Sequence, residues 1–137
     1  MTNDQEVVVG QPAGPDRGGP RPPNDLAERT ACFGEAVIDF SKTIARDVIS
    51  LPLISQLVRC ATSVGANYCE ADEAVSKKEF RQKIGYCKKE SRETKFWLRM
   101  VVRANPNKNE PARPLWKEAH ELHLIFCAIF RNTKPDS

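Results

Sequence analysis

Apolar side chains recur at steps of three and four residues along most of this chain, and that spacing is typical of helices. The clearest run places six side chains in one seam: Leu26, Thr30, Phe33, Val37, Phe40 and Ile44. Similar seams predict helices over about 25–46, 52–74, 76–105 and 114–133. We therefore predict an all-α protein, an antiparallel up-down-up-down four-helix bundle over residues 25–137. An extended helical hairpin that needs a partner is the alternative.

The boundaries of these helices have local signals. Pro52 and Pro114 suit the first turns of the second and fourth helices. Ser76 and Glu79 form a capping-box pattern at the start of the third helix, where Val75 is placed to pack on Phe80. These signals agree with the apolar seams.

A polar stripe runs along the predicted helix over 52–74. Its five members lie at steps of three and four residues and share one face: Gln56, Arg59, Ser63, Asn67 and Glu70. Short hydrogen-bonding side chains in this pattern suit a packed contact better than open water. We predict that the stripe is structural and that Arg59 pairs with Glu90 or Glu93 of the next helix. An active site is less favoured, because the sequence has no nucleophile beside a histidine and no glycine-rich phosphate loop.

The predicted third helix is strongly basic. Residues 76–103 contain ten Lys or Arg and three Glu, a net charge of +7. Seven of these cations, here called the basic row, fall on one flank at helical spacing: Lys78, Arg81, Lys88, Lys89, Arg92, Arg99 and Arg103. A solvated face, a nucleic-acid groove and a contact between subunits remain open. No base-reading motif accompanies the row, so any nucleic-acid binding would follow phosphate charge rather than base sequence.

The predicted fourth helix carries Trp116, His120, His123 and Cys127 on one flank. The pattern H-x2-H-x3-C could present metal ligands, but tight sites usually draw ligands from more than one element. We therefore favour a half-buried interface flank. We expect no metal, no cofactor and no catalytic residues.

Composition bears on the cellular location and the partners of the chain. Residues 1–24 are rich in Pro and Gly, which predicts a disordered tail, and they do not resemble a signal peptide. No segment has the roughly 18 apolar residues of a membrane span, so we expect no membrane partner. The five cysteines form no C-x-x-C pair, which predicts reduced thiols in the cytoplasm. The net charge of +3 does not by itself argue for nucleic acid.

The order and spacing of these residues resemble the S23 family of small bacterial four-helix bundle proteins, also named for the 23S rRNA intervening sequence. The resemblance covers about residues 26–134 and includes the family pattern Q-x-x-R-x-x-x-S-x-x-x-N-x-x-E. The matching positions are Phe33; Gln56, Arg59, Ser63, Asn67 and Glu70; Ser76, Glu79 and Phe80; and Glu90, Glu93, Thr94, Trp97 and Leu98. The chain departs from the usual pattern at Tyr68, Cys69 and Ala71, where we expect different packing near the following turn.

The resemblance implies a four-helix bundle that assembles into a ring-shaped homopentamer. Some relatives are accessory proteins of diversity-generating retroelements, where they bind a reverse transcriptase and nucleic acid. We therefore expect a non-enzymatic module that binds copies of itself and acts as an adaptor. The alternative is a nucleic-acid-binding accessory protein, for example the partner of a reverse transcriptase and its RNA.

Overall fold

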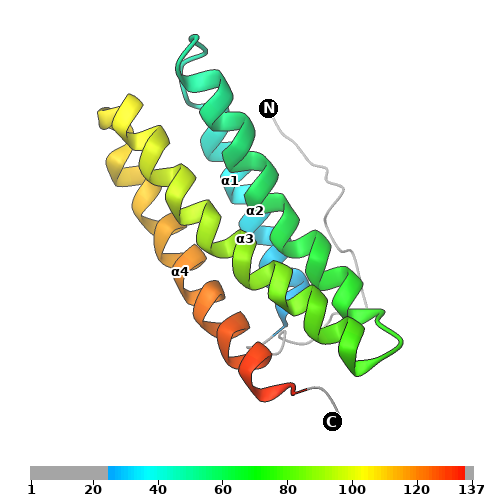
Figure 1. Cartoon of the computed structure of the whole chain (residues 1–137). Coiled ribbons are helices and arrows are strands. Elements are labelled where there is room, and N and C mark those ends of the chain that lie inside the picture. Colours follow the sequence, from blue (N-terminus) through cyan, green and yellow to red (C-terminus); the bar gives the residue numbers. More distant parts are fainter. Residues whose placement is uncertain (1–24, 135–137) are drawn as a thin grey trace, which may run out of the picture.

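The computed structural model describes residues 25–134 as four long helices and one short 3-10 helix (Figure 1). The elements are α1 (Leu26–Lys42), α2 (Ser50–Asp72), α3 (Lys77–Ala104), η3 (Pro106–Lys108) and α4 (Asn109–Asn132). This part of the chain contains no strand, and none of its helices is long and apolar enough to cross a membrane. The tail predicted over 1–24 and the last residues of the predicted domain, 135–137, lie outside the described residues.

One core lies between the four helices, and the predicted seams supply it. All six positions of the first seam are buried, as are Leu57, Val64, Leu98 and Phe126 from the other helices. The helix α3 packs against both α2 and α4, and α1 packs mainly against α2. The predicted core is therefore confirmed.

Contact between α1 and α4 is the thinnest of the helix pairings, and charged side chains support it. Arg29 on α1 donates two hydrogen bonds to the carboxylate of Glu118 on α4, with N–O distances of 2.7 and 2.8 Å. The same guanidinium also lies 3.0 Å from Glu121. These bonds raise the pKa of Arg29 and hold two helices that share little apolar surface.

The middle of α3 is lined by small hydroxyl side chains. Ser91 and Thr94 are fully buried, and each donates to a carbonyl oxygen one turn back, at 2.9 and 2.8 Å. Because these hydroxyls are satisfied within their own helix, they occupy the core without needing partners from α2 or α4.

The segment between α1 and α2 differs from the sequence prediction at both of its ends. The helix α1 ends at Lys42 rather than near Arg46, although Ile44 beyond it is still buried. Asp47 then starts the next helix early, because its carboxylate accepts hydrogen bonds from the amides of Ile49 and Ser50 at 3.1 and 2.7 Å. These bonds lower the pKa of Asp47.

At the same end of the bundle, where Asn105 donates to Ser50 at 3.0 Å, α4 begins at Asn109 rather than at Pro114 (Figure 1). The prediction that Pro114 lies in the first turn is wrong, because the helix starts earlier and continues through Pro114. Pro111 occupies the first turn instead, where no amide hydrogen is needed. The predicted capping box of α3 is present, with Ser76 accepting from the Glu79 amide at 3.0 Å. The predicted contact of Val75 with Phe80 is wrong, because Val75 is 92% exposed.

Candidate functional site

Arg59 is the member of the polar stripe that contacts two acids of α3. Its guanidinium lies 3.6 Å from Glu90 Oε2 and 3.5 Å from Glu93 Oε1, the pairing predicted from the sequence. Gln56 supports it from the preceding turn by accepting two bonds of 3.3 Å. Half of the Arg59 side chain is exposed, so the contact lies at the rim of the helix pair rather than in the core.

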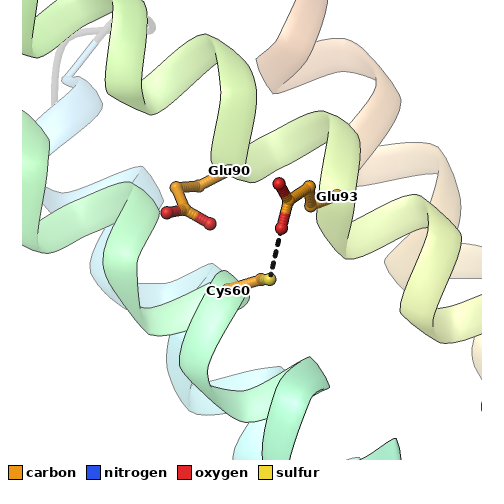
Figure 2. Close-up of side chains that lie close together, drawn as sticks. All are labelled: Cys60, Glu90 and Glu93. Atoms are coloured by element: carbon orange, nitrogen blue, oxygen red, sulfur yellow. Dashed lines mark hydrogen bonds between the residues drawn. The ribbon is translucent and has the colours of Figure 1, made fainter.

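Sequence reasoning missed a fourth member of this contact. Cys60 lies on the buried side of α2, and its thiol donates to Glu93 Oε1 at 3.5 Å (Figure 2). Arg59 Nη2 lies 3.1 Å from the same sulfur. Burial raises the pKa of Cys60 to about 12, and the nearby acids add to this, so the thiol keeps its proton at neutral pH. We call Arg59, Cys60, Glu90 and Glu93 the Arg59 cluster.

Within residues 25–134, one group of three side chains could hold a metal ion, and all three belong to the Arg59 cluster. Ligand atoms of Cys60, Glu90 and Glu93 lie within 4.8 Å of one another. Figure 2 shows both carboxylates reaching from α3 toward the sulfur on α2. A divalent ion would have to displace the thiol proton and compete with the guanidinium that already faces both acids. The present arrangement therefore neutralises its acids with Arg59.

The remaining stripe residues do not join one buried network. Asn67 donates to the carbonyl oxygen of Ser63 at 2.9 Å, a bond within α2. Glu70 turns to Lys83 of α3 at 2.7 Å, and 60% of its side chain is exposed. The stripe thus makes two separate cross-helix contacts, one at Arg59 and one at Glu70.

The basic row borders the groove between α3 and α4 and splits into two groups. Arg81 and Lys88 lie over the ring of Phe130 on α4, at 3.6 and 4.7 Å from its centre. Arg81 also donates to the Phe130 carbonyl oxygen at 3.3 Å. These two cations are therefore partly used within the chain. The others are exposed to solvent: Lys78, Lys89, Arg92, Arg99 and Arg103.

Large apolar side chains stand beside this row. Three of them are between 40% and 51% exposed: Tyr86, Phe96 and Trp116. A groove of about 800 Å³ lies next to Trp116, and Leu98, Val102 and Pro114 form much of its apolar wall. We call this surface the α3–α4 face. Basic and aromatic groups together suit a macromolecular contact rather than a water-facing surface.

The family described as 23S rRNA-intervening sequence protein matches residues 24–127. This chain belongs to that family. Among solved structures, it is similar to a protein of unknown function from the S23 ribosomal protein family of Bacteroides thetaiotaomicron, with 23% identity and a TM-score of 0.71. The similarity covers 78% of this chain and 99% of the other, and it shows a shared fold. No curated protein matches the chain.

The S23 assignment agrees with the local geometry but does not point to a reaction. The residues that matched the family pattern by sequence include three of the four members of the Arg59 cluster: Arg59, Glu90 and Glu93. Tyr68, one of the departures from the usual pattern, packs against Phe126 of α4 with ring centres 6.0 Å apart. Tyr68 therefore connects α2 to the core through Phe126.

Proposed function

We propose that this S23 protein is a non-enzymatic adaptor that works as a homo-oligomer in the cytoplasm. The proposal includes an antiparallel up-down-up-down course of the helices and a ring of five copies, a number that rests on the family resemblance alone. The observation that carries it is the α3–α4 face, because exposed aromatic side chains beside an apolar groove are unfavourable in water.

The other pair of helices offers a complementary surface. A groove of about 240 Å³ between α1 and α2 is lined mainly by small side chains, among them Ala31, Gly34 and Ala66. Glu35 of its wall and nearby Asp39 are exposed on α1. The α3–α4 face carries exposed aromatic side chains and cations, and the α1–α2 groove is shallow and acidic. Two such complementary surfaces favour a head-to-tail contact between subunits, which closes into a ring when the rotation between neighbouring subunits allows it.

A charge exchange between these surfaces tests the proposal. Light scattering at about 10 µM should find an oligomer for the wild type and a smaller species for Lys89→Glu/Arg92→Glu. Adding Glu35→Lys/Asp39→Lys to the same chain should restore assembly, because opposite charges would again face each other. Arg46→Glu/Arg131→Glu, which reverses two exposed cations outside both grooves, is the charge-matched control. A monomeric wild type would refute the proposal.

Nucleic-acid binding as an accessory to a reverse transcriptase is the second candidate. It is favoured by a hollow of about 550 Å³ in which Lys88, Lys89 and Arg92 surround the rings of Phe96 and Phe130. Cations near exposed rings suit the phosphates and bases of a single strand. A ring would also present this hollow several times, which raises avidity.

Binding to RNA should then be electrostatic and largely independent of sequence. Fluorescence anisotropy with a single-stranded RNA should show affinity falling steeply as salt rises. The variant Lys89→Glu/Arg92→Glu spares the two cations on Phe130, so it should abolish binding without loosening α3 from α4. Loss of RNA binding with the oligomer retained would support the second candidate. Loss of the oligomer would assign the same cations to the subunit contact.

A further inference from the structure

The five cysteines differ sharply in their surroundings. Cys60 and Cys87 are fully buried, and burial raises the pKa of each thiol to about 12. Cys32 is exposed, but its thiol donates to the carboxylate of Glu28 at 3.3 Å, an anion that disfavours a thiolate. Cys69 is exposed and lacks a hydrogen bond to either histidine of the described chain. Cys127 is different because it is half-buried beside an imidazole.

His123 lies one turn before Cys127 on α4, and its orientation is fixed from α3. Nδ1 lies 3.0 Å from the carbonyl oxygen of Lys88, which can only accept, so Nδ1 carries the hydrogen. Nε2 therefore presents a lone pair, and it lies 3.4 Å from the Cys127 sulfur. A thiol, a base and a group that orients the base form the arrangement that activates cysteine nucleophiles. The expectation from the sequence that no nucleophile lies beside a histidine is therefore wrong for Cys127 and His123.

The first histidine of the H-x2-H-x3-C pattern does not join this pair. His120 lies 3.0 Å from the ammonium of Lys95 and stacks on Trp116, with ring centres 5.3 Å apart. The pattern therefore gives a thiol–imidazole pair rather than three metal ligands.

Three cations of α3 face His123: Lys88, Arg92 and Lys95. Burial and these charges lower the pKa of His123, so the ring is neutral and able to accept a proton at pH 7. His123 also lines a hollow of about 550 Å³ together with the cations Lys89 and Arg92 and one anion, Glu93. A small molecule in this hollow reaches the ring of His123, and the Cys127 sulfur lies 3.4 Å from that ring.

We propose that Cys127 is a modification site for small anionic disulfides, with His123 as the base. His123 Nε2 takes the thiol proton, and the Cys127 sulfur attacks one sulfur of the disulfide. A new S–S bond forms as the original one breaks. The departing thiolate takes the proton back from His123, so Cys127 is oxidised to a mixed disulfide and the reagent is reduced to one thiol. Arg92 and Lys89 hold the anionic groups of the reagent.

The dianionic disulfide known as Ellman's reagent is a suitable probe. Short reactions at pH 7, followed by peptide mass spectrometry, should find Cys127 modified about tenfold faster than Cys32 or Cys69. His123→Gln should lower the rate at Cys127 about tenfold and leave Cys69 of the same molecule unchanged. Cys69 thus serves as an internal reference for the reagent, and continued protection of the buried Cys60 and Cys87 reports that the variant is folded. Equal rates at Cys127 and Cys69 in the wild type, or no effect of His123→Gln, would overturn the proposal.

The charge requirement is tested separately with Arg92→Gln. This variant should slow the reaction with Ellman's reagent severalfold, but it should change the reaction with uncharged hydroxyethyl disulfide much less. The same slowing for both disulfides would contradict an anion-holding role for Arg92. The readout is independent of assembly if both reactions are compared at one protein concentration.

Discussion

Arg59→Ala tests whether the Arg59 cluster stabilises the fold. The ion-pair distances of 3.5 and 3.6 Å are long, and half of the arginine side chain is exposed. Pairs of this kind contribute about 0.2–1 kcal/mol. Glu90 makes the loss larger, because its side chain is only 15% exposed and its Oε1 has no hydrogen-bond partner. Leaving that carboxylate without a cation adds about 1 kcal/mol.

The expected loss in the free energy of unfolding is therefore about 1–2 kcal/mol, below the roughly 3–5 kcal/mol of a fully buried pair. It corresponds to a fall in Tm of about 4–8 °C. Urea unfolding followed by circular dichroism measures it directly, and the urea dependence should stay unchanged. Arg103→Ala, which truncates an exposed arginine of α3 outside the cluster, is the control and should cost under about 0.5 kcal/mol.

A second substitution identifies the cause. Glu90→Gln in the Arg59→Ala background should recover at least half of the loss, because a neutral amide needs no cation beside it. Suppose instead that Arg59→Ala unfolds at the wild-type urea concentration, or that Glu90→Gln adds to the damage. The structural account of the cluster would then be wrong, and a ligand would be the better explanation of the stripe.

Three further predictions concern other contacts. Arg29→Met should cost about 1–2 kcal/mol, and Glu118→Gln should add little to it in a double-mutant cycle; additive losses would deny the pairing. Burial raises the pKa of the Cys60 and Cys87 thiols to about 12 in the folded protein. The protonated thiols therefore contribute fully to the free energy of unfolding below the unfolded-state pKa, and this contribution falls as the pH rises from about 9. Unfolding measured between about pH 8 and 10.5 should show this loss, and Cys60→Ala/Cys87→Ala should flatten it. Cobalt titration followed by absorbance should detect tighter binding to Arg59→Ala than to the wild type, because the resident cation is gone; equal affinities would argue against this competition.

The four helices were predictable because apolar residues repeat at helical spacing, and this repeat marks the buried face of each helix. The boundaries were less predictable, since Asp47 starts α2 with a side-chain bond and Pro111 is tolerated in the first turn of α4. The pairing of Arg59 with Glu90 and Glu93 followed from residue types on facing helices.

Other parts of the site could not be read from the sequence. The bond between Arg29 and Glu118 joins residues 89 positions apart, and no local pattern links them. Cys60 looked like an ordinary core residue, because only the angle between α2 and α3 brings its sulfur to Glu93. The orientation of His123 depends on a backbone carbonyl of α3, which carries no signal in the residue type of Lys88.

The hydroxyls of Ser91 and Thr94 donate only within α3, and this affects the register between α2 and α3. Small side chains bonded to their own helix let α2 and α3 approach closely, but they do not specify how far one helix slides along the other. At Ser91 and Thr94, a slide of one turn, about 5.4 Å, would break no hydrogen bond between the helices. It would separate Arg59 from its acids and Glu70 from Lys83. The polar contacts at the rim therefore help to fix the longitudinal alignment of the two helices, although each contributes little to stability.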